Sequence, residues 1–153
     1  MTRFFQRGGA WVIGQSVLLG ALGLLAVLCR GGGYRPASVI AGASMLCLGA
    51  GIALAGVVAL GKNLTPFPKP SEEVQLVRHG IYGLMRHPLY TSVMVLALGW
   101  ALVWQSWPAL LVVAVLPPFF AAKARREERW LRQKFPDYAA YAQQVRRFIP
   151  WVY

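Results

Sequence analysis

Four apolar segments, separated by shorter polar stretches, dominate the pattern of the chain. They cover about residues 10–29, 38–60, 89–104 and 109–122. The first two are long enough to cross the roughly 30 Å hydrocarbon core of a bilayer as helices. The third and fourth are shorter and predict a helical hairpin around the turn at 104–108. The pattern predicts an all-α integral membrane bundle of about four transmembrane helices.

Two features modify the second half of this pattern. Pro117 and Pro118 lie inside the fourth segment, where proline removes backbone hydrogen bonds and predicts a kink or a break. From Lys123 onward the chain is basic but keeps aromatic and apolar residues at helical spacing. This combination is typical of a helix that lies along the membrane surface, so we expect a C-terminal interfacial helix.

Small residues form a stripe on the second apolar segment. Gly42, Gly49 and Gly56 recur every seven residues and therefore share one helical face. Because small residues let helix backbones approach closely in lipid, the stripe predicts a packing face for another helix. A channel for a lipid tail along the same stripe is the alternative interpretation.

A polar connector, residues 61–88, joins the second and third segments and ends in Arg86-His87-Pro88. Because the residue before a proline is extended, the next helix begins at or after Pro88, with Arg86 and His87 at its N-terminus. This is a favourable place for a carboxylate or phosphate ligand. Interfacial snorkelling and helix capping are the alternative explanation for both side chains.

Length and composition agree with a single membrane-embedded domain, residues 1–153. The chain has 153 residues, of which 57% are hydrophobic, and its mean hydropathy is +0.48. A soluble domain of this size could not bury that much apolar surface. The first apolar segment is longer than the core of a signal peptide, so we expect it to be retained as a span.

The net charge of +11 is distributed unevenly around the expected spans. With four spans, fourteen of the sixteen Lys and Arg residues fall on the side of the termini, the connector and the tail. Because cytoplasmic loops carry the excess of positive charge, we expect this side to be cytoplasmic, in a bacterial inner membrane. Membrane lipids, and not nucleic acid, are the expected partners of the charge.

Glu127 and Glu128 are the only adjacent acids in the basic tail. Local salt bridges on an amphipathic helix are one explanation. Contact with a cationic or hydroxyl-rich part of a cofactor is the other. Dinucleotide, Walker, hydrolase and zinc motifs are absent from the sequence, and His79 and His87 are its only histidines, so we expect no metal site.

Taken together, these features resemble a known family. The elements that carry the resemblance are 63-NLTPFPKP-70, 76-LVRHGIYGLMRHPLY-90, Glu127-Glu128, Leu131, Phe135, Tyr138, Tyr141 and 149-IP-150. In this order they resemble the isoprenylcysteine carboxyl methyltransferase family, part of a wider group that includes the phospholipid N-methyltransferases. The resembling region, about residues 61–150, is the expected catalytic region.

The resemblance implies an integral-membrane enzyme that uses S-adenosylmethionine and takes a lipid-like substrate from the bilayer. It implies a cofactor pocket roofed by the cytoplasmic connector and the tail helix. The implied cofactor contacts are Val74, Gln75, Leu76, Val77, Tyr82, His87, Pro88, Leu89, Tyr90, Glu127 and Glu128. It also implies a basic substrate contact one turn before Glu127, which in this chain is Lys123.

The residue types suggest candidate roles in methyl transfer. Arg86 and Lys123 are suited to hold an anionic substrate head, so both are candidate substrate-binding residues. His87 or Tyr90 could assist deprotonation of an amine acceptor, whereas a carboxylate acceptor needs no base. We therefore take Arg86, His87 and Tyr90 as the candidate catalytic residues.

Carboxyl O-methylation of an isoprenylcysteine-type or other prenylated small molecule is the function that the resemblance favours. Phospholipid (ethanolamine) N-methylation is the alternative within the same class. An NADPH-dependent sterol-type reductase is a second alternative, since sterol reductases carry a similar Arg-His-Pro-x-Tyr element. The acidic pair favours the methyltransferase, because the 2′-phosphate of NADPH would prefer arginine there. A catalytically silent lipid-binding protein would leave the ordered motifs unexplained.

Overall fold

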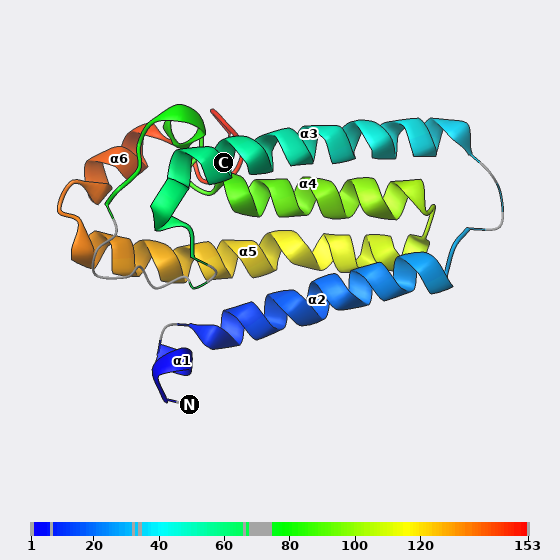
Figure 1. Cartoon of the computed structure of the whole chain (residues 1–153), viewed down its shortest axis with the longest axis horizontal. Helices are drawn as coiled ribbons and strands as arrows, with labels where there is room; N and C mark the ends of the chain where they lie inside the picture. Colours follow the sequence, from blue (N-terminus) through cyan, green and yellow to red (C-terminus); the bar gives the residue numbers. More distant parts are fainter. Residues whose placement is uncertain are drawn as a thin grey trace.

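The computed structural model describes residues 2–6, 8–31, 33, 35–65, 67 and 75–152. Four long helices make up a bundle: α2 (Gly9–Leu28), α3 (Pro36–Leu60), α4 (Pro88–Val103) and α5 (Trp107–Lys134). The shorter elements are α1 (Thr2–Gln6), α6 (Tyr138–Gln144) and the 3-10 turns η1 (Gly61–Asn63) and η2 (Gly80–Gly83). The long helices lie side by side, and the two ends of the chain, the connector and α6 gather at one end of the bundle (Figure 1).

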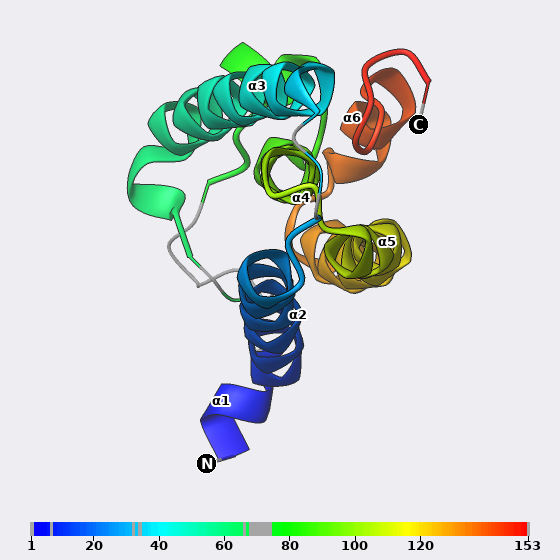
Figure 2. The same cartoon turned by 90° about the vertical axis from the view of Figure 1, so that its right-hand side faces the viewer.

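Helix α4 is the centre of the bundle. Seen end-on, it lies between α3 on one side and α2 and α5 on the other (Figure 2). Three of its buried residues, Ala97, Gly99 and Ala101, are small and let these neighbours approach closely. At the start of the helix Pro88 and Ser92 are buried too, so the first turn of α4 is packed within the bundle.

The helices α2, α3 and α5 are each long and apolar enough to cross a membrane, whereas α4 is a shorter apolar helix of 16 residues. α2 and α3 leave most of their apolar surface on the outside of the bundle, for example at Leu24, Ile40 and Val58. Outward apolar side chains on every face are expected where the solvent is lipid. The prediction of an all-α membrane bundle is confirmed.

The glycine stripe is the contact between α3 and α4. Gly42, Gly49 and Gly56 are the buried residues of α3. A Cβ atom added at Gly42 would lie 2.8 Å from the Gly99 carbonyl oxygen, so the two backbones are in direct contact. The helix-packing interpretation is confirmed, and the alternative of a lipid channel along the stripe is wrong because α4 fills it.

Alanine at Gly42 is expected to lower the free energy of unfolding by about 1–3 kcal/mol, since the added Cβ would clash with the backbone of α4. Gly51→Ala is the matched control, because an added Cβ on this exposed glycine of the same helix meets nothing within 4 Å. Thermal unfolding in detergent micelles measures both variants. Equal unfolding midpoints would contradict the close approach of α3 and α4.

Helix α5 differs from the prediction for the second half of the chain. Its 28 residues run from Trp107 to Lys134 without a break at Pro117 and Pro118. Membrane helices tolerate proline because neighbouring helices help to satisfy the freed backbone groups. Residues 123–134 continue this helix and do not begin a separate one, and the short α6 follows; the interfacial position of the C-terminal helix stays a prediction. Ala124 and Glu128 are buried, so packing holds the extension in place.

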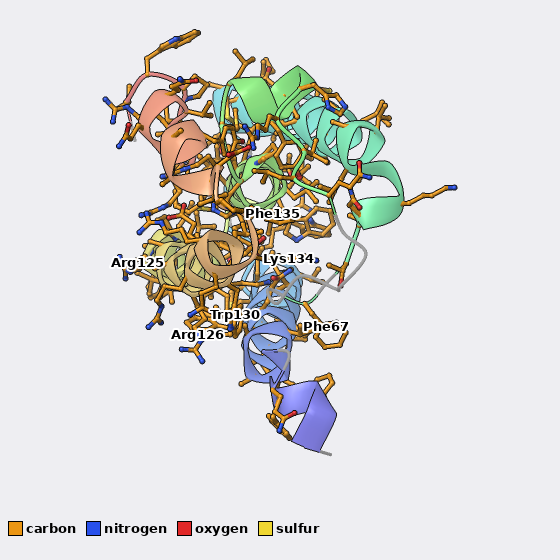
Figure 3. All side chains as sticks on the ribbon, turned by 90° about the vertical axis from the view of Figure 1, so that its left-hand side faces the viewer. Phe67, Arg125, Arg126, Trp130, Lys134 and Phe135 are labelled. Carbon is orange, nitrogen blue, oxygen red and sulfur yellow. The ribbon has the colours of Figure 1, made fainter. Side chains whose placement is uncertain are left out.

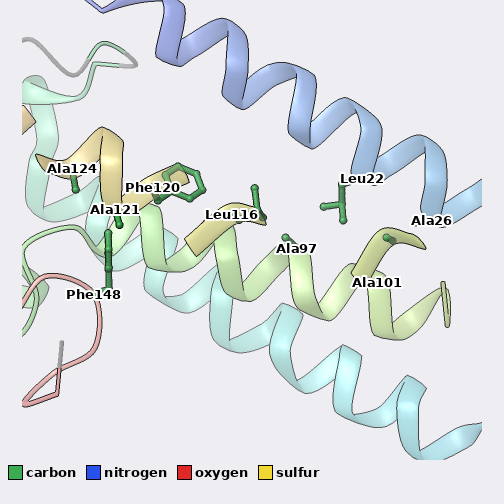
Figure 4. Packing of buried hydrophobic residues seen from close by; sticks show 10 residues of the cluster. Leu22, Ala26, Ala97, Ala101, Leu116, Phe120, Ala121, Ala124 and Phe148 are labelled. Carbon is green, nitrogen blue, oxygen red and sulfur yellow. The ribbon is translucent and has the colours of Figure 1, made fainter. Parts of the chain in front are cut away.

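One apolar core joins α2, α4, α5 and the residues that follow α6, which we call the C-terminal tail from here on (Figure 4). It comprises Leu22, Ala26, Ala97, Ala101, Ala109, Leu116, Phe120, Ala121, Ala124 and Phe148. Phe148 is the tail's contribution and is only 5% exposed. Its ring lies 5.9 Å from the His87 ring, and its carbonyl accepts a hydrogen bond from the Thr91 hydroxyl. The core therefore anchors the tail beside the first turn of α4.

Candidate functional site

The C-terminal tail pairs with the segment that leads into α4. The Arg86 N–H donates to the Arg146 carbonyl at 2.8 Å, and the His87 N–H donates to the Arg147 carbonyl at 3.0 Å. α4 begins at Pro88 with His87 as its N-cap, as the proline rule predicts. The backbone at Arg86 and His87 is thus fixed from two directions, by the helix and by the tail.

The connector and α5 meet at His87. This side chain is buried and lies between the two adjacent carboxylates of α5. Its Nε2 is 3.2 Å from Glu128 Oε1, and its Nδ1 is 3.8 Å from Glu127 Oε2. Segments about forty positions apart are therefore in direct contact through one imidazole ring.

Tyr90 completes this group from the first turn of α4. Its hydroxyl donates a hydrogen bond of 2.5 Å to Glu127 Oε2. Its ring is parallel to the His87 ring, with the two centroids 5.2 Å apart. It also stacks on Phe120 of α5, with the two centroids 5.0 Å apart. Glu127 is therefore held by a tyrosine whose own orientation is fixed by stacking.

Glu128 is the centre of a buried ion network. Arg147 donates to both carboxylate oxygens, from Nε at 3.0 Å and from Nη2 at 2.8 Å. Arg86 Nη2 lies 3.4 Å from Glu128 Oε1, next to the His87 contact. The residue is only 2% exposed. These partners satisfy the carboxylate, so Glu128 connects the tail, the connector and α5.

A cavity with mixed polar and aromatic walls opens beside this group, at the end of the bundle that carries the connector. We call it the polar cavity. It is lined by Leu60, Asn63, Thr65, Phe67, Gln75, Leu76, Val77, Tyr82, Arg86, His87, Leu89, Tyr90, Glu127, Leu131, Phe135, Tyr138 and Tyr141. Figure 3 views this end, with Phe67 on the connector beside α2 and Phe135 at the end of α5.

Most of the residues predicted as cofactor contacts line the polar cavity. They are Gln75, Leu76, Val77, Tyr82, His87, Leu89, Tyr90 and Glu127. Arg86, predicted to bind substrate and to act in catalysis, lines it as well. Pro88 and Glu128 are buried outside the lining, and Val74 lies outside the described residues. The roles of these residues stay predictions.

Lys123, the predicted substrate contact, is also outside the lining. It is 3% exposed, and its Nζ donates a hydrogen bond of 2.6 Å to Gln15 Oε1 of α2. The same ammonium group lies 4.9 Å from the centroid of the Tyr90 ring. Lys123 therefore lies on the α2 side of α5, against Tyr90, and its role as a substrate contact stays a prediction.

Part of the cavity wall consists of residues that were not predicted as contacts. Leu60, Asn63, Thr65, Phe67, Leu131, Phe135, Tyr138 and Tyr141 line the polar cavity without having been predicted as contacts. The aromatic residues among them belong to the motif set of the resemblance, and Leu131 follows Glu127 by one helical turn. That spacing was the available signal, because residues one turn apart share a helix face.

Two polar atoms at the polar cavity lack partners. Among the described residues, Arg86 Nε and the Tyr138 hydroxyl are the buried side-chain atoms without a hydrogen bond. Burial, reinforced by the Glu128 charge, raises the pKa of Tyr138 far above its usual range, so its hydroxyl stays protonated. An unsatisfied buried polar group costs about 1–3 kcal/mol. Both atoms thus carry unused hydrogen-bonding capacity in residues that line the polar cavity.

Tyr141 is satisfied, in contrast to Tyr138. Its hydroxyl donates a hydrogen bond of 2.6 Å to the Tyr82 carbonyl. Burial raises the pKa of Tyr141 to about 12, against the lowering effect of the Arg86 and Arg78 charges. The protonated hydroxyl thereby fastens α6 to the connector. Within the described residues, no group of three or more His, Cys, Asp or Glu side chains could hold a metal ion.

Comparison with known proteins connects this site to a family. The sequence model of the family described as "Phospholipid methyltransferase" matches residues 37–138, which include α3, α4 and α5. The Arabidopsis thaliana protein-S-isoprenylcysteine O-methyltransferase B is 30% identical over 115 residues, covering 72% of this chain and 58% of that protein. A probable protein-S-isoprenylcysteine O-methyltransferase of Oryza sativa subsp. indica is 33% identical over 115 residues, with 72% and 60% covered.

A bacterial relative matches over a shorter stretch. The cobalt-zinc-cadmium resistance protein of Cupriavidus metallidurans is 40% identical over 79 residues, which cover 49% of this chain and 35% of that protein. The chain thus spans less than two thirds of the length of each of these relatives. The family match extends over most of the chain and includes His87, Tyr90 and Glu127. The resemblance is confirmed, and the chain belongs to the phospholipid methyltransferase family.

Proposed function

We propose that the protein is a membrane methyltransferase that uses S-adenosylmethionine and acts on a lipid-like acceptor. The observation that carries the proposal is the position of Glu127, a carboxylate held by Tyr90 beside His87, in the wall of the polar cavity. Membership of a methyltransferase family supports it. The apolar helices around the cavity suit an acceptor that comes from the membrane.

The chemistry of the cavity fits this methyl donor. S-adenosylmethionine, when bound, supplies a sulfonium methyl group that an acceptor can attack. Both contacts of the Glu127 carboxylate within the described chain involve Oε2, which leaves Oε1 for an ammonium group or a ribose hydroxyl. The Tyr138 hydroxyl and Arg86 Nε add two unpartnered donors, and Phe135 adds an aromatic wall.

The residues of the chain act mainly by positioning and by excluding water. Stacking of Tyr90 between His87 and Phe120 fixes the Glu127 carboxylate, so a bound cation is held in one place. Leu131 and Phe135 form an apolar part of the wall, which would limit water around a bound ligand. Alignment and water exclusion are the main requirements of an in-line displacement.

His87 is the group placed to receive a proton when the acceptor is an amine. A carboxylate only accepts hydrogen bonds, so the His87 Nε2 next to Glu128 carries its proton toward that residue. Nδ1, on the Glu127 side of the ring, is then the nitrogen that can take up a proton. A carboxylate acceptor is already a nucleophile and makes no use of this step.

We propose carboxyl O-methylation of an isoprenylcysteine-type compound as the reaction, supported by the relatives named as isoprenylcysteine O-methyltransferases. Phospholipid (ethanolamine) N-methylation is the second candidate, since the matching family is described as phospholipid methyltransferase. We also propose that the end with the termini, the connector and α6 faces the cytoplasm of a bacterial inner membrane. The excess of Lys and Arg at that end supports this orientation.

Calorimetry on the full-length protein in detergent tests the donor. We expect S-adenosylhomocysteine to bind and NADPH to leave the signal unchanged. Binding of NADPH alone would contradict the proposal and favour the reductase. Transfer of a radiolabelled methyl group to a farnesylated cysteine derivative, compared with phosphatidylethanolamine in mixed micelles, then separates the two acceptors.

A further inference from the structure

A second hollow lies at the same end of the bundle, between α2 and α5. We call it the arginine cleft, and it is lined by Trp11, Ala122, Arg125, Glu128, Arg129, Arg132 and Arg147. It is separate from the polar cavity. Glu127 and Leu131 line only the polar cavity, whereas the next residue in each case, Glu128 and Arg132, lines only the cleft. In Figure 3, Arg125 points away from the side on which Phe67 and Phe135 lie.

The cleft carries positive charge that the described residues do not neutralise. In the described part of the chain, no carboxylate forms an ion pair with Arg125, Arg129 or Arg132, and all three are exposed. The acid in the cleft wall, Glu128, is already bound by Arg147 on both oxygens. Because these three arginines follow each other by four and three residues, they share one helix face and concentrate their charge.

The position of the arginines along α5 matches the head-group layer of a membrane. At about 1.5 Å per residue, Arg125 lies about 27 Å along the helix from Trp107, close to the roughly 30 Å thickness of the hydrocarbon core. Arg132 lies two turns further out, on the same face. Trp11 on α2 borders the cleft, and tryptophan is enriched at this depth.

An apolar surface leads up to the arginines from the membrane interior. Leu111 and Pro118 precede Arg125 and Arg132 at seven-residue intervals, so all four lie on nearly the same face of α5. Leu111 is 59% exposed, and Pro118 is exposed as well. A ligand with an anionic head and hydrocarbon chains would therefore match the whole length of this face, whereas a free anion would use only its end.

We propose that the arginine cleft binds the phosphate of an anionic phospholipid of the cytoplasmic leaflet, as a resident lipid distinct from the methyl acceptor. Guanidinium groups bind phosphate oxygens through paired hydrogen bonds, and three of them line the cleft without an ion pair to any described carboxylate, since Glu128 is bound by Arg147. The inference does not rest on the proposed methyl transfer, because none of the three arginines lines the polar cavity; only the choice of leaflet follows from the proposed orientation.

Native mass spectrometry of the full-length protein, titrated with phosphatidylglycerol or phosphatidylcholine in detergent, tests the site. We expect phosphatidylglycerol to bind in preference to phosphatidylcholine. The double variant Arg125→Gln/Arg129→Gln is expected to bind phosphatidylglycerol about thirtyfold more weakly, since each interfacial arginine contributes about fivefold in affinity. The single variant Arg132→Gln is a second test that removes only one charge and is expected to weaken binding by about fivefold.

The matched control is Lys62→Gln/Arg126→Gln, which removes the same charge from exposed residues outside the cleft. It is expected to bind phosphatidylglycerol within about twofold of the wild type, because interactions outside the cleft are screened. Equal losses in the two double variants would overturn the proposal in favour of diffuse surface attraction. Displacement of the lipid by equimolar inorganic phosphate would overturn it in favour of a free-anion site.

Discussion

Replacing Glu127 by glutamine is expected to weaken the binding of S-adenosylhomocysteine by about tenfold to a hundredfold. Glutamine keeps the size of the side chain and its contact with Tyr90, but it removes the charge that faces the polar cavity. A hydrogen bond to a charged group contributes about 1.5–3 kcal/mol, which corresponds to this range. Calorimetry on the detergent-solubilised protein gives the dissociation constants directly.

Asp137→Asn is the control for this prediction. It removes one negative charge at the same end of the bundle, but Asp137 is 74% exposed and pairs with Arg78 on the surface. Surface ion pairs contribute little, so we expect no change in ligand binding. An unchanged affinity in a Glu127→Gln variant that unfolds like the wild type would contradict the proposed role of Glu127 in binding the methyl donor.

Replacing Arg147 by methionine is expected to lower the free energy of unfolding by about 3 kcal/mol. The change removes two hydrogen bonds from the buried Glu128 carboxylate, which is 2% exposed and then keeps only the Arg86 and His87 contacts. A buried charge that loses its main partner is costly because water does not replace that partner. The shift is measured by thermal and denaturant unfolding in micelles.

Arg146→Met is the matched control for Arg147→Met, since the neighbouring arginine is exposed and contributes only its backbone carbonyl to the contact with Arg86. We expect its unfolding midpoint to equal that of the wild type. Similar losses in the two variants would show that the tail needs basic side chains in general, and not the particular pairing of Arg147 with Glu128.

The helix bundle could be predicted from the sequence because apolar periodicity, glycine and proline mark most of its boundaries. The observed bounds of α2, α3 and α4 lie within two residues of the predicted spans. The end of the fourth span was not predictable in this way. The change to basic composition at Lys123 resembles a helix end, whereas α5 continues because Ala124 and Glu128 pack inside the protein.

The site could be predicted only down to the level of short segments. The ordered motifs and the distribution of charge indicated that the connector and α5 meet, and His87 lies between the two glutamates. Which glutamate faces the polar cavity depends on the rotation of α5, since adjacent helical residues point about 100° apart. Whether Arg146 or Arg147 pairs with Glu128 depends likewise on how the extended C-terminal tail is turned. Residue types carry no information on either rotation.

Helix α4 begins about one turn short of the end of α3, at the end of the bundle that carries the polar cavity. Leu89 packs at the level of Gly56, and α3 continues to Leu60, which is about 6 Å further. With 16 residues α4 is about 24 Å long, against about 30 Å of hydrocarbon. His87 therefore lies about one helical turn below the end of α3. In the proposed reaction the acceptor keeps its tail in the leaflet while its head reaches the imidazole. Only the water-soluble donor has to enter the polar cavity from the aqueous side.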